Sequence, residues 1–418
     1  MDCQNFGPGL APDRPGRVAE IVRLQQARGR AALTATERAL LADWYEQTGP
    51  AGPAGSAGSV GSAGSAGSAG SAGGERGPAG EEEERTVIAL LTRPFSREEI
   101  PEYYRYTSLH VYDWFLRPYQ ADPLPAGITA LRATLLDLAA KEAEPPPELP
   151  AFGTAESTER RSRLAALISE LDELLAQTVA RSEAPWPGSP TPGLRRRLSV
   201  LTGCTGFPQS PEHHEHLFLR SVHACEVVFY LARWTACQAI AAVLADDLDR
   251  AILRTRQTAS CAELLNGILH VLRTLSPEQF MTFRAATGAA SAVQSLNYHL
   301  VELAVYGYDP RKAEVFLGIA HLHELNSRPY RDLWPLRSAV RATDAPELTA
   351  AFEAVERALL TWRGRHYGFG ARYLPRQLKG SGGTEGAGYL KRIVDKDPCR
   401  PGPVGGPPPE AMFRFALR

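Results

Sequence analysis

The chain has 418 residues, of which 44% are apolar, and a formal net charge of −1. This length is enough for two or three ordinary domains, or for one large core with low-complexity additions. A nearly neutral chain has no overall basic field, so a nucleic-acid-binding function is not indicated. The six cysteines form no CxxC pair, and no apolar signal sequence opens the chain. These features favour a cytoplasmic protein with reduced thiols over a disulfide scaffold.

The composition changes along the chain and predicts four parts. Residues 1–49 form an N-terminal helical segment, because 17–47 have helical periodicity. Residues 50–85 are rich in Gly, Ser and Ala and end in an acidic run, which predicts a disordered linker that cannot bury a core. Residues 86–395 form the main domain, and 396–418 form a Pro/Gly-rich C-terminal tail.

The main domain has a helical pattern almost throughout. Strand signals, meaning alternating β-branched runs with turn pairs, are missing. The fold class is therefore all-α, a bundle of long helices of the kind that encloses cofactors between facing helices. The most apolar stretch, 227–245, is interrupted by Arg233 and Gln238, which favours a buried bundle helix over a membrane span. Helices are predicted at about 97–118, 127–142, 155–183, 212–247, 249–274, 290–306, 309–325 and 345–375.

One histidine stands out by its context. His366 follows an apolar-periodic helical stretch and lies among four arginines. A neutral imidazole on a bundle-lining helix, with cationic side chains nearby, suits a haem iron and its propionates. From spacing alone, however, a packed histidine on an arginine-rich helix is the favoured interpretation.

Two other segments are candidates for ligand binding. The loop "GSGGTEG" at 380–386 could form an anion nest or close over a small substrate, with Ser381 and Thr384 as hydroxyl donors, or it could be an ordinary linker. Arg284 precedes a run of small residues and could pair bidentately with a carboxylate. A surface salt bridge is the commoner fate of an arginine.

Five separated segments, in this order along the chain, together resemble the haem-dependent tryptophan 2,3-dioxygenase superfamily. The resemblance spans roughly residues 95–395. Its motifs are "YYRYTSL" (103–109), "LFLRSVHACEVVF" (217–229), "FRAATGAASAVQS" (283–295), "WRGRH" (362–366) and "GSGGTEGAGYL" (380–390).

The resemblance implies a cofactor, haem b, whose iron is bound by His366. It places Trp362, Arg363 and Gly382 at the cofactor. It assigns Arg284 to the carboxylate of an amino-acid substrate, with Ser381 assisting. The further substrate-binding positions that it implies are Phe218, Tyr103, Tyr106 and Ser291, the two tyrosines being contributed to the neighbouring subunit's site.

The chain departs from the family pattern at the distal side of the haem. The position that matches the family's distal histidine is Val222, and His223 stands one residue later. His223 is the candidate distal catalytic residue, but one helical step is a rotation of about 100°, so either Val222 or His223 could face the haem. A second departure is Ala292, which follows Ser291 where relatives have glycine.

The resemblance implies a haem-dependent oxygenase that inserts O2 into the indole ring of tryptophan or a tryptophan derivative. An alternative is a haem-dependent mono-oxygenase that hydroxylates an aromatic amino acid in specialised biosynthesis. A second alternative is a non-catalytic haem-binding or helical interaction protein. A homotetramer is implied by the resemblance alone.

Overall fold

The computed structural model describes residues 16–49, 78–143, 155–181, 186–187, 190–373, 387–396 and 405–416. The expected all-α class is confirmed, since the described residues contain helices and no strand. The α-helices are α1 (Arg17–Ala27), α2 (Ala35–Thr48), α3 (Pro78–Thr92), α4 (Glu102–Thr107), α5 (His110–Leu116), α6 (Leu124–Ala143), α7 (Ala155–Val179), α8 (Pro192–Thr205), α9 (His213–Leu244), α10 (Leu248–Leu272), α11 (Pro277–Arg284), α12 (Leu296–Tyr306), α13 (Ala313–Gly318), α14 (Arg328–Arg331), α15 (Leu336–Ala342), α16 (Pro346–Tyr373) and α17 (Ala387–Val394). Short 3₁₀ helices are η1 (Arg30–Ala32), η2 (Arg93–Phe95), η3 (Arg117–Tyr119), η4 (Ala292–Gln294), η5 (Pro310–Lys312), η6 (Ala320–Asn326) and η7 (Glu410–Phe413).

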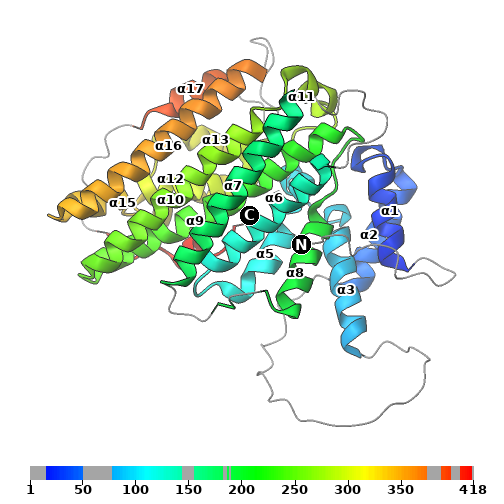
Figure 1. Cartoon of the computed structure of the whole chain (residues 1–418), viewed down its shortest axis with the longest axis horizontal. Coiled ribbons are helices and arrows are strands. Elements are labelled where there is room, and N and C mark those ends of the chain that lie inside the picture. Colours follow the sequence, from blue (N-terminus) through cyan, green and yellow to red (C-terminus); the bar gives the residue numbers. More distant parts are fainter. Residues whose placement is uncertain are drawn as a thin grey trace, which may run out of the picture.

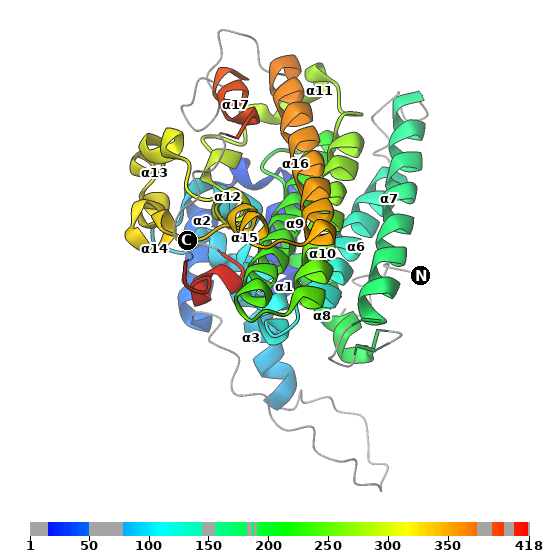
Figure 2. The same ribbon diagram turned by 90° about the vertical axis from the view of Figure 1, so that its left-hand side faces the viewer.

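Helix α9 is the centre of the bundle. It packs along α10, α12 and α6, and α10 lies between α9 and α16 (Figure 1). In the view turned by 90°, α7 lies along one side of the bundle next to α6, and α13 and α14 lie on the other (Figure 2). Among the described residues, α9 alone is long and apolar enough to span a membrane by length and composition, but 78% of its most apolar window is buried in the protein. This burial is that of a core helix.

The N-terminal helices join the same apolar core as the bundle. Ile21, Leu41 and Trp44 are buried in one continuous cluster with the residues of α9 and α16. Helices α1 and α2 pack on α3, at the edge of the bundle that α8 also occupies (Figure 1).

Several boundaries differ from the predicted ones for local physical reasons. Helix α3 begins at Pro78, so residues 78–85 belong to a helix and not to the predicted linker. Its acidic run lies in the first turns, where the positive end of the helix dipole stabilises carboxylates. The predicted helix 97–118 is broken because Ser108, at φ 52°, adopts the left-handed conformation that ends α4. The rest of the predicted linker, 50–77, lies outside the described residues.

Two further predicted helices are shorter or divided. The helix expected at 290–306 begins at Leu296, where the Ser295 side chain accepts the Tyr298 N–H as an N-cap. The stretch 309–325 is divided into η5, α13 and η6. The helices that were not predicted are α3, α8, α11, α14, α15 and α17.

A buried ion pair fastens α7 to α6. Arg160 and Glu142 are 2% and 0% exposed, and the guanidinium NH1 donates to the carboxylate at 2.7 Å. The remaining Arg160 nitrogens donate to the hydroxyl and carbonyl of Thr274, beyond the end of α10. The pair therefore ties three helices together in the interior.

We predict that Arg160→Ala lowers the free energy of unfolding by about 3–5 kcal/mol, because it leaves the Glu142 carboxylate buried without its partner. Urea titration followed by circular dichroism measures this as a lower midpoint with an unchanged slope. Arg132→Ala is the matched control, because it breaks the exposed pair of Arg132 with Asp172 between the same two helices and should cost less than about 1 kcal/mol. Equal losses in both variants would contradict the prediction.

Candidate active site

Helix α16 presents a histidine in an apolar setting. The imidazole of His366 stacks on the indole of Trp362, one turn earlier, with ring centroids 5.2 Å apart and planes at 24°. Burial lowers the pKa of His366 to about 4, so the ring is neutral at physiological pH. No hydrogen bond from a described residue occupies either of its nitrogens. A neutral imidazole with an available nitrogen lone pair is a suitable ligand for a metal ion.

The neighbouring Trp362 carries a buried donor without a partner. Its side chain is 5% exposed, and its Nε1–H makes no hydrogen bond within the described part of the chain. The indole packs against Phe229 of α9 and Tyr298 of α12, at centroid distances of 5.4 and 5.8 Å. Buried polar groups are nearly always paired, so this donor beside His366 fits an acceptor on a bound ligand.

An aromatic cluster connects α9 to α16 across α11. Phe218 of α9 contacts Phe280 and Phe283 of α11 at centroid distances of 5.5 and 5.7 Å. Phe280 in turn contacts Phe369 and Tyr373 at 6.4 and 5.7 Å. The last two residues follow His366 by one and two turns of α16, so the cluster extends from α9 towards the histidine.

The structure brings several predicted substrate residues to Phe218. Tyr106 of α4 packs with Phe218 and Ala290 in one small apolar cluster. Ser291 directly follows Ala290, and Arg284 ends α11 next to Phe283, which touches the same phenylalanine. Three segments far apart in the chain, 103–106, 218 and 284–291, thus meet at one place.

His223 does not lie on the face of α9 that bears Phe218. It is fully buried, and its Nε2 is 2.7 Å from the carbonyl oxygen of Thr107, at the end of α4. Burial, followed by the charge of Arg220, holds the pKa of His223 well below its usual range, so the neutral ring donates through Nε2–H. The Nε2–H of His223 is thus committed to the end of α4, and a role of His223 as a distal catalytic residue stays a prediction. Val222 shares the face of Phe218 at a spacing of four residues.

Arg363 is held by protein groups. Its Nε donates to the Val394 carbonyl at 2.7 Å, and its guanidinium lies 5.0 Å from the ring of Tyr306 and 3.8 Å from the carboxylate of Glu302. These contacts direct it to the end of α17. Its predicted contact with a cofactor stays a prediction. Ser381 and Gly382, also predicted at the site, lie outside the described residues.

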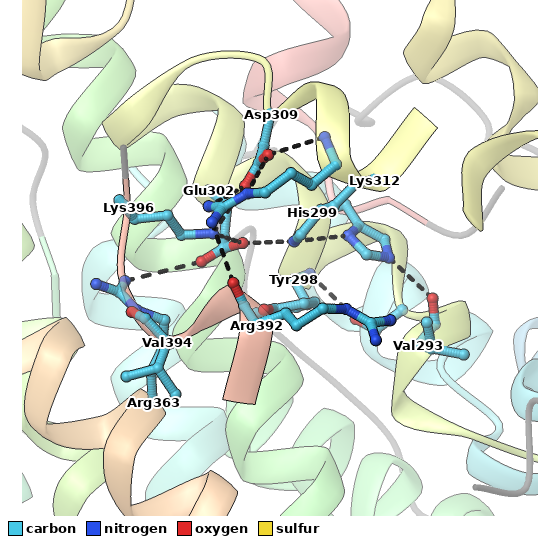
Figure 3. A network of polar contacts seen from close by, with 12 residues as sticks. Val293, Tyr298, His299, Glu302, Asp309, Lys312, Arg363, Arg392, Val394 and Lys396 are labelled. Carbon is cyan, nitrogen blue, oxygen red and sulfur yellow. Dashed lines mark hydrogen bonds and ion pairs between the residues drawn. The ribbon is translucent and has the colours of Figure 1, made fainter. Parts of the chain in front are cut away.

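A buried charge cluster next to α16 was not predicted from the sequence (Figure 3). The Glu302 carboxylate of α12 accepts from the Lys312 and Lys396 ammonium groups at 2.5 and 2.7 Å. The Lys396 ammonium also lies 3.7 Å from Asp309, and Arg363 completes the group. Burial lowers the pKa of Lys312 to about 8, although Glu302 opposes this effect. Because Lys396 follows α17, the cluster fastens α17 to α12 and α16.

Glu226 is a second buried group that sequence reasoning missed. Its carboxylate accepts from the Tyr103 hydroxyl at 2.7 Å and from the Asn297 side-chain amide at 2.9 Å. The Asn297 side chain also pairs with both backbone groups of Ala416. Burial raises the pKa of Glu226. The available signal was a lone carboxylate inside the apolar run "ACEVVFY".

Comparison with known proteins gives one consistent result. A family model described as tryptophan 2,3-dioxygenase matches residues 202–312, which include Phe218, Arg284 and Ser291 but not His366. The chain is 30% identical over 148 residues to a tryptophan 2,3-dioxygenase of Bradyrhizobium sp. strain BTAi1, covering 35% of this chain and 44% of that relative.

Two further relatives are matched over more of their length. The chain is 26% identical over 228 residues to the tryptophan 2,3-dioxygenase of Kineococcus radiotolerans, covering 44% of this chain and 79% of that relative. It is also 26% identical over 228 residues to the enzyme of that name from Geobacillus thermodenitrificans, covering 45% and 81%.

The Glu302 cluster predicts a pH dependence of stability. Burial alone would raise the pKa of Glu302, but Lys312, Lys396 and Arg363 outweigh it and hold the pKa well below the ordinary 4.5. A depressed carboxyl pKa contributes stability that is present above the unfolded value and is lost as the pH falls through the folded value.

We therefore predict that Glu302→Gln lowers the free energy of unfolding by about 3–5 kcal/mol above pH 5, and that this difference from wild type shrinks as the pH falls below about 4.5. Urea titrations between pH 3 and 7 would measure it. Glu356→Gln on α16, whose carboxylate is 38% exposed and pairs with Arg337, is the control and should show a much smaller difference. A difference for Glu302→Gln that does not change with pH would contradict the prediction.

Proposed function

Because the chain is a member of the tryptophan 2,3-dioxygenase superfamily, we propose that it is a haem-dependent oxygenase that inserts O2 into the indole ring of tryptophan or a tryptophan derivative. The observation that carries this proposal is the pair formed by His366 and Trp362. A neutral imidazole lies against an indole with a buried N–H, and neither group makes a hydrogen bond to a described residue. A cytoplasmic location and a homotetramer stay predictions.

The residues on α16 fit haem b. His366 would bind the iron, since burial keeps its ring neutral and its nitrogen available. Trp362 would donate its N–H to an acidic group of the cofactor. When bound, the haem would supply the iron at which O2 is activated.

Apart from that of Ser381, which lies outside the described residues, the remaining roles belong to residues near Phe218. Arg284 would hold the substrate carboxylate, for which a guanidinium provides a rigid pair of donors. Phe218 and Tyr106 would pack against the indole ring, since they form one apolar cluster with Ala290. Ser291 lies beside that cluster, and Ser381 would assist with the substrate's polar end. Holding the ring and the carboxylate together orients the indole and limits the access of water.

The alternative is a single hydroxylation of an aromatic amino acid. The specific observation behind it is Val222, an apolar side chain on the face of α9 that carries Phe218, while the adjacent imidazole of His223 is committed to Thr107. No imidazole proton donor therefore stands at position 222. Dioxygenation of an indole does not strictly require such a group, so it remains the first proposal.

We predict that the purified protein, expressed with haem supply, shows a Soret band that titrates to one haem per chain, shifts with dithionite and CO, and is lost or strongly weakened in His366→Ala. The physical reason is the loss of the axial nitrogen ligand. His270→Ala, an exposed histidine on α10, is the control and should keep the band. A Soret band that is indifferent to His366 would overturn the assigned ligand, and a protein that takes up no haem would leave the non-catalytic alternative.

We predict that Arg284→Ala raises the KM for tryptophan or its active analogue by about 10- to 100-fold, because a charge-assisted carboxylate contact is lost. Met281→Ala, an exposed position on the same helix, should leave KM unchanged. An unchanged KM in Arg284→Ala would contradict the role of Arg284.

Mass spectrometry of the product decides between the two reactions. Two added oxygen atoms support dioxygenation, and one added oxygen atom supports hydroxylation.

A further inference from the structure

The short helix η4 lies directly after Ser291, a predicted substrate residue, and leads into α12. A 3₁₀ helix of three residues leaves its last carbonyl groups without partners inside the helix, so other groups must hold it in place. The Val293 carbonyl of η4 lies 2.8 Å from Nε2 of His299. A carbonyl oxygen only accepts, so the imidazole donates from Nε2–H and fixes the end of η4.

The other nitrogen of His299 faces a buried cation (Figure 3). Its Nδ1 lies 3.4 Å from the Lys312 ammonium, and the imidazole is 1% exposed. An ammonium group has no lone pair and can only donate, so it requires Nδ1 to be the unprotonated nitrogen. Burial, followed by the charge of Lys312, holds the pKa of His299 well below its usual range, so the ring is neutral. Both neighbours of the ring therefore require the same tautomer.

Lys312 is itself held by one turn of α12. Its side chain is 2% exposed, and the ammonium donates to the Glu302 carboxylate at 2.5 Å and lies 4.5 Å from the ring centroid of Tyr298. Because 298, 299 and 302 lie within about one helical turn, three side chains of α12 contact the same ammonium. A buried cation that is paired in this way has a defined position.

The Glu302 cluster also holds the element that packs on η4. The side chain of Val293 forms a small apolar cluster with Tyr389 and Ile393 of α17. The Lys396 ammonium, just after α17, pairs with the Glu302 carboxylate at 2.7 Å. One carboxylate therefore holds α17 through a direct ion pair and η4 through the buried lysine and the imidazole.

We propose that Lys312 and His299 are positioning residues for the reaction: the ammonium fixes the tautomer of His299, the Nε2–H of His299 holds η4, and η4 sets the place of Ser291 at the substrate. The proposal rests on the proposed function, because Ser291 has this role only if an aromatic amino acid binds beside it. His299 acts through η4 and does not itself contact the substrate.

Two amide substitutions of His299 separate the roles of its nitrogens. Glutamine places an amide N–H close to the position of Nε2, whereas asparagine is shorter and reaches only the position of Nδ1. We predict that His299→Asn raises the substrate KM by about 5- to 30-fold, with a smaller change in kcat. His299→Gln should stay within about threefold of wild type, because it restores the donor to the Val293 carbonyl.

The control for these variants is His323→Ala, an exposed histidine whose Nε2 binds the Leu317 carbonyl, outside η4. It should leave KM unchanged. An unchanged KM in His299→Asn, or an equal rise in the asparagine and glutamine variants, would overturn the positioning role of His299.

The tautomer of His299 can be read in the wild-type protein. Long-range proton–nitrogen correlation spectra of the full chain with labelled histidine should show, at pH 7, a neutral His299 ring that carries its proton on Nε2. The signals are assigned by their loss in His299→Gln. A ring protonated on Nδ1, or on both nitrogens, would overturn the proposal whatever the variants do.

Hydrogen exchange separates the proposal from the reaction itself. Exchange of the amides in 291–298 should accelerate by at least about tenfold in His299→Asn and Lys312→Met. It should not change in His299→Gln or in Lys391→Met, which replaces an exposed lysine on α17. Unchanged exchange in folded His299→Asn and Lys312→Met proteins that still bind haem would overturn the proposal and leave the proposed function intact. Faster exchange in variants of a protein that binds no haem would show that the two residues hold η4 and would defeat the proposed function.

Discussion

The arrangement of the candidate site depends on one desolvated carboxylate, that of Glu226 in the middle of α9. A carboxylate taken out of water needs hydrogen-bond donors, and the nearest ones come from elements far away in sequence: the Tyr103 hydroxyl of α4 and the Asn297 amide of α12. Asn297 in turn binds the backbone of Ala416. Satisfying one buried group therefore brings together α4, α12 and the C-terminal segment, and places the loop before α12 next to Phe218.

The two helices of the proposed haem site have different physical tasks. Helix α16 supplies a stacked pair, His366 and Trp362, whose ring nitrogens make no hydrogen bond to the residues that the structure describes. Helix α9 supplies an apolar face that carries both Phe218 and Phe229. Its polar residues His223 and Glu226 instead contact α4. The proposed metal ligand thus lies on α16, whereas the polar groups of α9 hold the neighbouring elements of the site in place.

The features of the fold and site that could be predicted from the sequence are those that residues close together in the chain determine. Apolar periodicity predicted α9, α10 and α16 to within a few residues, because each buries one long stripe. It could not show that Ser108 adopts a left-handed conformation, because the groups that contact this end of α4, Arg30 and His223, are distant in sequence. The choice between Val222 and His223 was also inaccessible, because the rotation of a helix is set by its neighbours. The partners of Glu226 and Glu302 are distant in sequence, so only the unusual carboxylates themselves were visible.

The buried charged groups lie away from the proposed substrate site and hold short helices in place. Arg30 at one edge and Arg363 of the Glu302 cluster at another both carry buried guanidinium groups, and each contacts the end of a short helix, α4 or α17. Helices of six and eight residues have little stability of their own. Apolar packing alone would let them slide, whereas a buried guanidinium is satisfied in one position only. The charges are therefore located where short elements need a defined place, and the face of α9 that bears Phe218 is left apolar.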